Sequence, residues 1–188
     1  MGKFLVGLIL GIAIFPALIL AYLMLGFAPA AATAPPMPFE RFLAGIALDS
    51  RISREAPKRD LSSFANKDLA AGANIYKKNC ATCHGLPPQP APQIAPAMFP
   101  EAPQLLTPEG MVTDDPVGVT YWKVQNGIRL SGMPSFQSAL TDQQRWDVSA
   151  FLARVDKLPS EAQEALKPVP EPVAAPSPAP SPAPANTK

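Results

Sequence analysis

The longest apolar run in the chain lies at its N-terminal end. Residues 4–28 carry no charged side chain, and Lys3 directly precedes them. About 20 apolar residues are enough to cross a hydrocarbon core of ~30 Å, so the run predicts a transmembrane anchor over 4–28. A cleaved signal peptide is the alternative, because small residues typical of a cleavage region follow at 30–34. The run exceeds the ~7–15 apolar residues of a signal peptide, which favours the uncleaved anchor.

A helical spacing of apolar positions returns in the next segment, a linker over 29–65. Four apolar residues stand at i, i+3, i+4 and i+7: Phe39, Phe42, Leu43 and Ile46. Charged residues lie between and after them, so the pattern predicts a short amphipathic helix over 38–53. Three roles are open for its apolar side: packing on the same chain, lying on the membrane surface, or docking a partner.

The following pattern predicts one all-α domain over 66–158, because helix signals recur and no convincing alternating strand is present. The first helix is expected over 67–80, after an N-cap at Asn66. A second helix should begin at Pro116, with Asp115 as its N-cap, and stop near Gly127. A last helix should run from Thr141 to about Val155, because Thr141-Asp142-Gln143-Gln144 is a capping-box pattern.

Two segments are predicted to be irregular. Eight Pro between 87 and 108 predict a long loop inside the domain, and such loops in compact domains are usually functional. Residues 159–188 are predicted to form a Pro-rich disordered tail, because large apolar side chains are almost absent after Lys167.

Composition narrows the classes of function. The chain has 188 residues, a net charge of +1, two Cys and one His. The balanced charge excludes a protein built around nucleic-acid phosphates, which requires a clustered basic surface. Two Cys exclude a disulfide framework. A single His excludes a poly-histidine metal site, and any Ser-His-Asp or Cys-His catalysis would have to involve His84.

The most informative motif is Cys80-Ala81-Thr82-Cys83-His84. On a helix the i, i+3 spacing puts Cys80 and Cys83 at neighbouring positions of one face, where both thiols reach the vinyl groups of one porphyrin. His84 then comes under the ring with a nitrogen lone pair for the iron, and Cys-x-x-Cys-His is the attachment pattern of c-type haem. A zinc site needs four ligands and a thioredoxin-like pair needs a βαβ pattern. Neither is available, so one covalent haem c is the expected cofactor.

The second axial ligand of the iron is a separate question. No second His exists, which excludes ligation by two histidines within the chain. Met133 lies between Gly132, which frees the backbone, and Pro134, which fixes it, so a loop can present the sulfur at a defined point. Met133 is therefore the expected partner of His84. The alternatives are Met98, Met111, a Lys or an open position.

Together these features resemble the class I c-type cytochromes over about residues 66–157. Gly72 and Tyr76 stand eight and four residues before Cys80, like the Gly and the aromatic residue that let the first and last helices of that family cross closely. The facing positions on the last helix are Val148 and Phe151. The order of attachment motif, irregular loop, helix, Gly-Met-Pro loop and final helix also matches.

The resemblance implies roles for three further residues. The carbonyl oxygen of Pro103 is expected to accept the Nδ1–H of His84, a bond that fixes the ring and raises its basicity. Trp122 and Arg129 are expected to contact the haem edge or its propionates. Core packing is the alternative for Trp122, and a solvated surface charge is the alternative for Arg129.

The implied function is one-electron transfer, because His and Met fill both axial positions and leave no vacant site for oxygen or peroxide. The chain is expected to be an electron carrier and not an enzyme, with redox proteins as donor and acceptor and no small-molecule substrate. One alternative is a fixed haem subunit of a larger respiratory or dehydrogenase complex. Another is a haem enzyme or gas sensor with an open sixth position.

The expected topology follows from the cofactor. The c-type haem of bacteria is attached outside the cytoplasm, so the resemblance implies that residues 1–3 are cytoplasmic. The domain over 66–158 should then lie on the periplasmic or outer face of the membrane.

Overall fold

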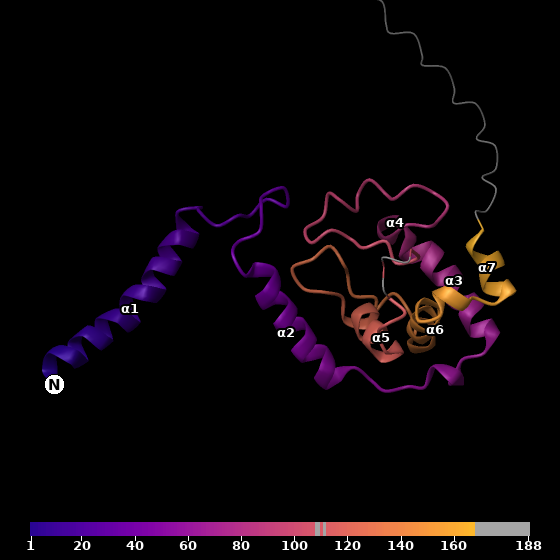
Figure 1. The fold of residues 1–188 in the computed structure, drawn as a ribbon, viewed down its shortest axis with the longest axis horizontal. Coiled ribbons are helices and arrows are strands. Elements are labelled where there is room, and N and C mark those ends of the chain that lie inside the picture. The colour runs from indigo at the N-terminus through magenta and orange to yellow at the C-terminus, as the bar shows by residue number, and fades with distance from the viewer. Residues whose placement is uncertain (108–109, 111, 168–188) are drawn as a thin grey trace, which may run out of the picture.

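The computed structural model describes residues 1–107, 110 and 112–167 (Figure 1). Within these residues the chain forms helices and no strand, so the all-α prediction is confirmed. Met111 and the tail beyond residue 167 lie outside the described residues. The α-helices are α1 (Gly2–Met24), α2 (Glu40–Glu55), α3 (Asn66–Asn79), α4 (Ala81–His84), α5 (Val117–Asn126), α6 (Asp142–Leu152) and α7 (Ser160–Leu166), and short 3-10 turns lie at Leu61–Ser63 and Val155–Lys157.

α1 is long and apolar enough to cross a membrane. It has 23 residues, a mean hydropathy of 2.8 over its most apolar window, and no residue buried against the rest of the chain. At 1.5 Å per residue its length is ~35 Å, slightly more than a hydrocarbon core. It ends at Met24 and not at residue 28, because Gly26 takes a positive φ of 77° and turns the chain. An anchor and a signal sequence both have these properties.

α3 and α6 form the centre of the domain and cross at Gly72. A Cβ at Gly72 would collide with the carbonyl oxygen of Asp147 and would lie 2.7 Å from Cβ of Phe151. One turn further along α3, the rings of Tyr76 and Phe151 pack with their centroids 5.6 Å apart, and both side chains are fully buried. Val148 is also fully buried, although the backbone of Asp147 makes the close approach to Gly72.

α5 packs on α6 through stacked aromatic rings. The ring centroids of Tyr121 and Trp146 are 4.0 Å apart. The capping box expected at the start of α6 is present: Thr141 Oγ1 accepts the N–H of Gln144 at 3.3 Å, and Gln144 Oε1 accepts the N–H of Thr141 at 2.8 Å. Local sequence therefore sets the start of α6, and aromatic packing joins α6 to α5.

Two helices begin one residue away from the predicted position. α3 includes Asn66, because the carboxylate of Asp68 accepts the N–H of Ala65 at 2.9 Å and makes Ala65 the cap residue. Pro116 caps α5 and is not its first residue, since its ψ of 139° is extended.

α6 ends earlier than predicted, at Leu152 and not near Val155. Arg154 leaves the helical conformation with a φ of −125°. Its guanidinium donates to the carbonyl oxygen of Leu61 at 3.2 Å, which fastens the end of the helix to the segment before α3. A contact across this sequence distance decides the end of the helix.

The predicted start of the disordered tail is wrong, because Ser160–Leu166 form α7. This helix packs on α3, and Ala162 is fully buried there. Lys77 of α3 donates through Nζ to the carbonyl oxygens of Ala165 at 2.5 Å and Lys167 at 3.1 Å. The domain therefore extends to residue 167.

α2 lies between α1 and the domain (Figure 1). It begins and ends two residues later than predicted. Ile52 is buried, but Phe42, Leu43 and Ile46 are exposed. The apolar side identified from the sequence therefore does not pack on the described part of the chain.

Candidate functional site

The Cys-x-x-Cys-His motif begins at Cys80, between α3 and α4, and its other four residues form α4. The N–H of Cys80 donates to the carbonyl oxygen of Tyr76 at 2.8 Å, and the N–H of His84 donates to the carbonyl oxygen of Cys80 at 2.9 Å. Cys80, Cys83 and His84 are half-buried, and both Cys are free thiols. One helical turn thus carries two thiols and an imidazole.

The imidazole of His84 is held by the backbone of the Pro-rich loop. Its Nδ1 lies 2.8 Å from the carbonyl oxygen of Pro103. A carbonyl oxygen can only accept a hydrogen bond, so Nδ1 carries the proton and Nε2 carries the lone pair. The structure therefore brings His84 and Pro103 together and leaves Nε2 as the ring atom available to a metal.

Tyr76 and Gln104 hold the end of α4. The Tyr76 hydroxyl donates to the carbonyl oxygens of Gly85 at 2.8 Å and His84 at 3.1 Å. Burial raises the pKa of Tyr76, so this hydroxyl keeps its proton. Gln104 Nε2 lies 3.5 Å from the carbonyl oxygen of Cys83, and a Cβ at Gly85 would collide with Gln104 Oε1.

Sequence reasoning did not identify either of these polar roles. Tyr76 was assigned to the helix crossing by its aromatic ring alone, which gives no information on the partner of its hydroxyl. Gln104 received no role, although its position next to Pro103 was a usable signal. Both side chains act on backbone carbonyls, and the sequence does not indicate which carbonyl a side chain reaches.

The setting of Cys80 keeps it as a thiol. Burial raises the pKa of Cys80 to about 12, and the neighbouring Cys83 adds to the shift. The thiolate is the form that binds metal ions and attacks disulfides. A Cys80 thiol that keeps its proton at neutral pH is a weak nucleophile, which disfavours a thioredoxin-like redox pair.

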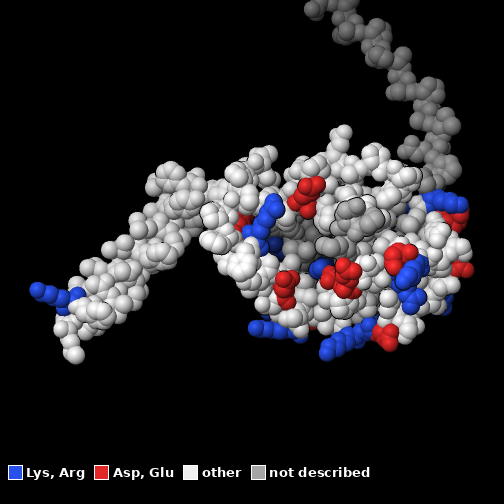
Figure 2. Space-filling view, in the orientation of Figure 1, with Lys and Arg blue, Asp and Glu red and all other residues white. Residues whose placement is uncertain are grey.

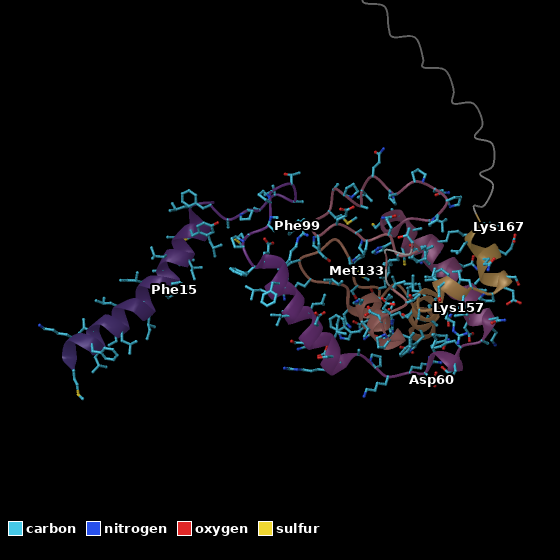
Figure 3. The ribbon with its side chains drawn as sticks, in the orientation of Figure 1. Phe15, Asp60, Phe99, Met133, Lys157 and Lys167 are labelled. Atoms are coloured by element: carbon cyan, nitrogen blue, oxygen red, sulfur yellow. The ribbon has the colours of Figure 1, made fainter. Side chains whose placement is uncertain are left out.

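Met133 lies on a loop fastened to the C-terminal end of α5. Its carbonyl oxygen accepts the N–H of Ile128 at 3.2 Å, and its own N–H donates to Ser131 Oγ at 3.2 Å. Gly127 has a φ of 68°, and a Cβ there would lie 2.7 Å from the carbonyl carbon of Pro134. The Met133 side chain is half-buried against the core, and Figure 3 labels it toward the middle of the domain.

Met98, an alternative ligand in the sequence analysis, lies against the same loop. Its Sδ is the atom that a Cβ at Gly132 would meet first. Met98 is half-buried, like Met133. The structure thus places two of the three candidate thioethers at this loop, whereas Met111 lies outside the described residues.

Trp122 lies on the side of α5 that faces α2. Its indole Nε1 donates to Glu55 Oε2 at 3.1 Å. It also lines a cleft of about 380 Å³ that includes Pro57 and Asn126. Arg129 is exposed. None of the hydrogen bonds found among the described residues joins Trp122 or Arg129 to the His84 region, so their contacts with a haem remain predictions.

The donor atoms fit a porphyrin better than a single metal ion. Within residues 1–107, 110 and 112–167, no three His, Cys, Asp or Glu side chains are placed to hold an ion. A porphyrin instead needs thiols at its edge and one nitrogen lone pair for its iron. Cys80, Cys83 and Nε2 of His84 would supply these groups, and Met133 and Met98 are the candidate thioethers.

Comparisons with known proteins concern the same part of the chain. Residues 67–152 match the family model described as "Cytochrome C oxidase, cbb3-type, subunit III". The chain is 33% identical over 85 residues to cytochrome c6 of Synechococcus elongatus, an alignment that covers 45% of this chain and 87% of that protein. The alignment with cytochrome c6 of Thermosynechococcus vestitus has the same identity and length and covers 68% of that protein. No solved structure matches the chain.

Proposed function

Because the chain belongs to the class I c-type cytochromes, we propose that it is a membrane-anchored carrier of single electrons with one covalent haem c. Cys80 and Cys83 would hold the porphyrin by thioether bonds, and His84 and Met133 would bind its iron. The bound haem supplies a centre that accepts and releases one electron. The chain's own residues orient the ligands, limit the access of water and present the site to redox partners.

The observation that carries the proposal is the 2.8 Å hydrogen bond from His84 Nδ1–H to Pro103. This bond fixes the tautomer and directs the lone pair of Nε2 away from the loop. A hydrogen-bond partner of this kind orients the ring of a metal-binding His. Tyr76 and Gln104 support the same arrangement, because they hold the backbone of residues 83–85.

Met133 is proposed as the second axial ligand because its loop is restrained at both ends. Ser131 binds the N–H of Met133, and Ile128 binds its carbonyl oxygen. Ser135 Oγ also donates to the carbonyl oxygen of Gln125 at 2.6 Å. A thioether held without rearrangement suits both oxidation states of an iron, and His/Met ligation raises the reduction potential relative to two imidazoles.

Met133→Ala in the haem-loaded full-length chain tests the ligand, with Met98→Ala as the matched control. We expect Met133→Ala to abolish the sulfur-to-iron charge-transfer band of the oxidised protein and to lower its reduction potential. Met98→Ala should leave both nearly unchanged. The reverse result would assign the sixth position to Met98. A wild-type chain whose mass shows no bound haem would refute the whole proposal.

Membrane anchoring is the second part of the proposal and rests on α1. The helix has the length and hydropathy of a span, and no residue of it is buried. Figure 2 shows charge on α1 only at its N-terminal tip. The proposed topology leaves residues 1–3 in the cytoplasm and the haem domain on the outer or periplasmic face. Membrane fractions should therefore retain a haem-stained chain of full length, whereas a cleaved signal would give a shorter soluble form.

A second candidate function is a fixed haem subunit of a respiratory complex. The description of the family model favours it, because that model is named for subunit III of a cbb3-type oxidase. Mild detergent extraction followed by size separation distinguishes the two functions. A free carrier elutes alone, whereas a subunit elutes in constant ratio with the other members of its complex.

A further inference from the structure

α2 uses one side to hold the domain. Arg41 lies over the ring of Phe99, with its Cζ 5.5 Å from the ring centroid. Ile52 is only 5% exposed, and Glu55 accepts the indole N–H of Trp122. Residues 41, 52 and 55 lie on one side of an α-helix, since 3.6 residues complete each turn. Contacts with the domain therefore occupy this side from the beginning of α2 to its end.

The opposite side of α2 changes character along its length. Its first half is apolar and exposed, with exposed fractions of 75% at Phe39, 64% at Phe42, 61% at Leu43 and 49% at Ile46. Its second half is polar and exposed: Asp49, Ser50, Ser53 and Arg54. Exposed apolar residues that gather in one patch indicate an interaction site. This patch lies at the end of α2 that is nearer to α1 in the chain.

The segment between α1 and α2 extends the apolar character. No Asp, Glu, Lys or Arg occurs between Lys3 and Glu40. Residues 25–39 span at most ~50 Å when fully extended, at 3.3–3.6 Å per residue, so this segment is long enough to reach the membrane surface and limits the patch to that distance from the end of α1. Phe27 and Met37 in this segment are also exposed. The chain therefore stays free of charge from the predicted span up to the apolar end of α2.

We propose that Phe39, Phe42, Leu43 and Ile46 insert into the headgroup–acyl boundary of the bilayer that α1 crosses. α2 then lies on the membrane surface and fixes the orientation of the haem domain, which it holds through its other side. The inference rests on the proposed anchoring by α1. A bilayer fits better than a protein partner, because apolarity is confined to the membrane-proximal half and continues without charge into α1. Amphipathic interfacial helices bind membranes through such an apolar side.

Spin labels on the haem-loaded full-length chain in phosphatidylcholine vesicles test the proposal. Both native Cys are consumed by the haem, so single Cys substitutions provide unique sites. Phe42→Cys reports on the patch, Ser53→Cys on the polar half of the same side, and Phe15→Cys on the interior of α1. Accessibility to dissolved oxygen and to an aqueous nickel chelate is measured at each site, with the haem oxidised in every sample.

We expect the ratio of oxygen to nickel accessibility to be highest at Phe15→Cys. At Ser53→Cys it should equal the value of a label in water, the aqueous value, and at Phe42→Cys it should lie above that value. An aqueous value at Phe42→Cys with a high value at Phe15→Cys would overturn the proposal and leave the anchor intact. Low accessibility to both reagents at Phe42→Cys would also overturn it and would indicate a protein contact. An aqueous value at Phe15→Cys would refute the anchor itself.

Discussion

At the scale of single residues, the hydroxyl of Tyr76 adds a structural role to that of the ring, which the family resemblance indicated. It is fully buried and donates to the carbonyl oxygens of Gly85 and His84. Tyr76→Phe keeps the ring against Phe151 and leaves these buried carbonyls without their donor. We expect a loss of about 1–3 kcal/mol in the free energy of unfolding of the haem-loaded protein, measured with denaturant.

Tyr121→Phe is the matched control for Tyr76→Phe. The hydroxyl of Tyr121 donates to the side chains of Gln125 and Asp142, at 2.6 and 2.5 Å. The carboxylate of Asp142 is largely exposed and can exchange this bond for water. The loss should therefore be smaller, about 0.5–1.5 kcal/mol. No loss of stability in Tyr76→Phe would mean that Tyr76 acts only through its ring, and a loss equal to that of Tyr121→Phe would contradict the special role of the buried hydroxyl.

Asp147 makes stability depend on pH. Burial raises the pKa of Asp147 above its ordinary value of 3.8, Asp68 adds to the shift, and the hydrogen bond from Gln143 opposes it. The folded protein then binds more protons than the unfolded chain above pH 3.8. Folding stability from this group therefore falls as pH rises from 3.8 through the raised pKa, and stays low above it.

Asp147→Asn removes this dependence and keeps an oxygen that accepts from Gln143. We expect the variant to be more stable than the wild type at pH 7, with the difference shrinking as the pH is lowered toward 3.8. Unfolding free energies of both proteins at a series of pH values provide the comparison. A difference that stays constant with pH would show that the ionised carboxylate is not the cause.

At the scale of elements, Gly127 couples the end of α5 to the Met133 loop. Its φ of 68° costs a residue with a Cβ about 1–2 kcal/mol. A Cβ there would also lie 2.7–2.8 Å from backbone atoms of residues 133–135. Gly127→Ala should displace the loop, weaken the charge-transfer band and lower the reduction potential. Gly45→Ala is the control, because a Cβ at Gly45 would meet nothing within 4 Å. An unchanged spectrum of Gly127→Ala would contradict the coupling between α5 and the Met133 loop.

The elements also show which parts of the fold the sequence could predict. The capping box at Thr141 was recognisable because local chemistry requires those residue types, whereas the glycine at the α3–α6 crossing was expected from the family resemblance. α7 was missed because its docking depends on Lys77 and on burial of Ala162, and seven residues leave no periodic signal. The observed end of α6 differs from the predicted one where a distant residue makes a contact: Arg154 donates to the carbonyl oxygen of Leu61.

The candidate site follows the same division. Cys80, Cys83 and His84 were identified by spacing, because attachment chemistry fixes it. The haem contact expected of Trp122 stays a prediction, and the bond of its indole to Glu55, 67 positions away in the chain, could not be foreseen from the sequence. The sequence also could not predict that the apolar side of α2 is exposed. Periodicity defines an apolar side of a helix but does not show what packs against it.

At the scale of the whole molecule, charge divides the chain into two parts. No charge lies between Lys3 and Glu40, whereas residues 60–157 contain eight Lys or Arg and nine Asp or Glu. The domain therefore lacks the excess of one sign that steers partners over long distances. A carrier held at a membrane searches for its partner in two dimensions, and close contacts then decide the encounter more than the overall field does.

Electron transfer in native membranes should accordingly depend weakly on salt. Steered association speeds encounters by ~10–10³-fold and loses that gain as ions screen it. For this domain we expect less than about a threefold change in the rate of haem oxidation between ~0.01 and ~0.15 M ionic strength, a range that shortens the screening length from ~30 to ~8 Å. Glu101→Lys, at an exposed position, should leave this weak dependence in place. A tenfold fall of this rate with salt would instead require a local patch of one charge on the surface of the domain that meets the partner. Repeating the charge reversal at Asp114 and Lys78 would then map the position of that patch.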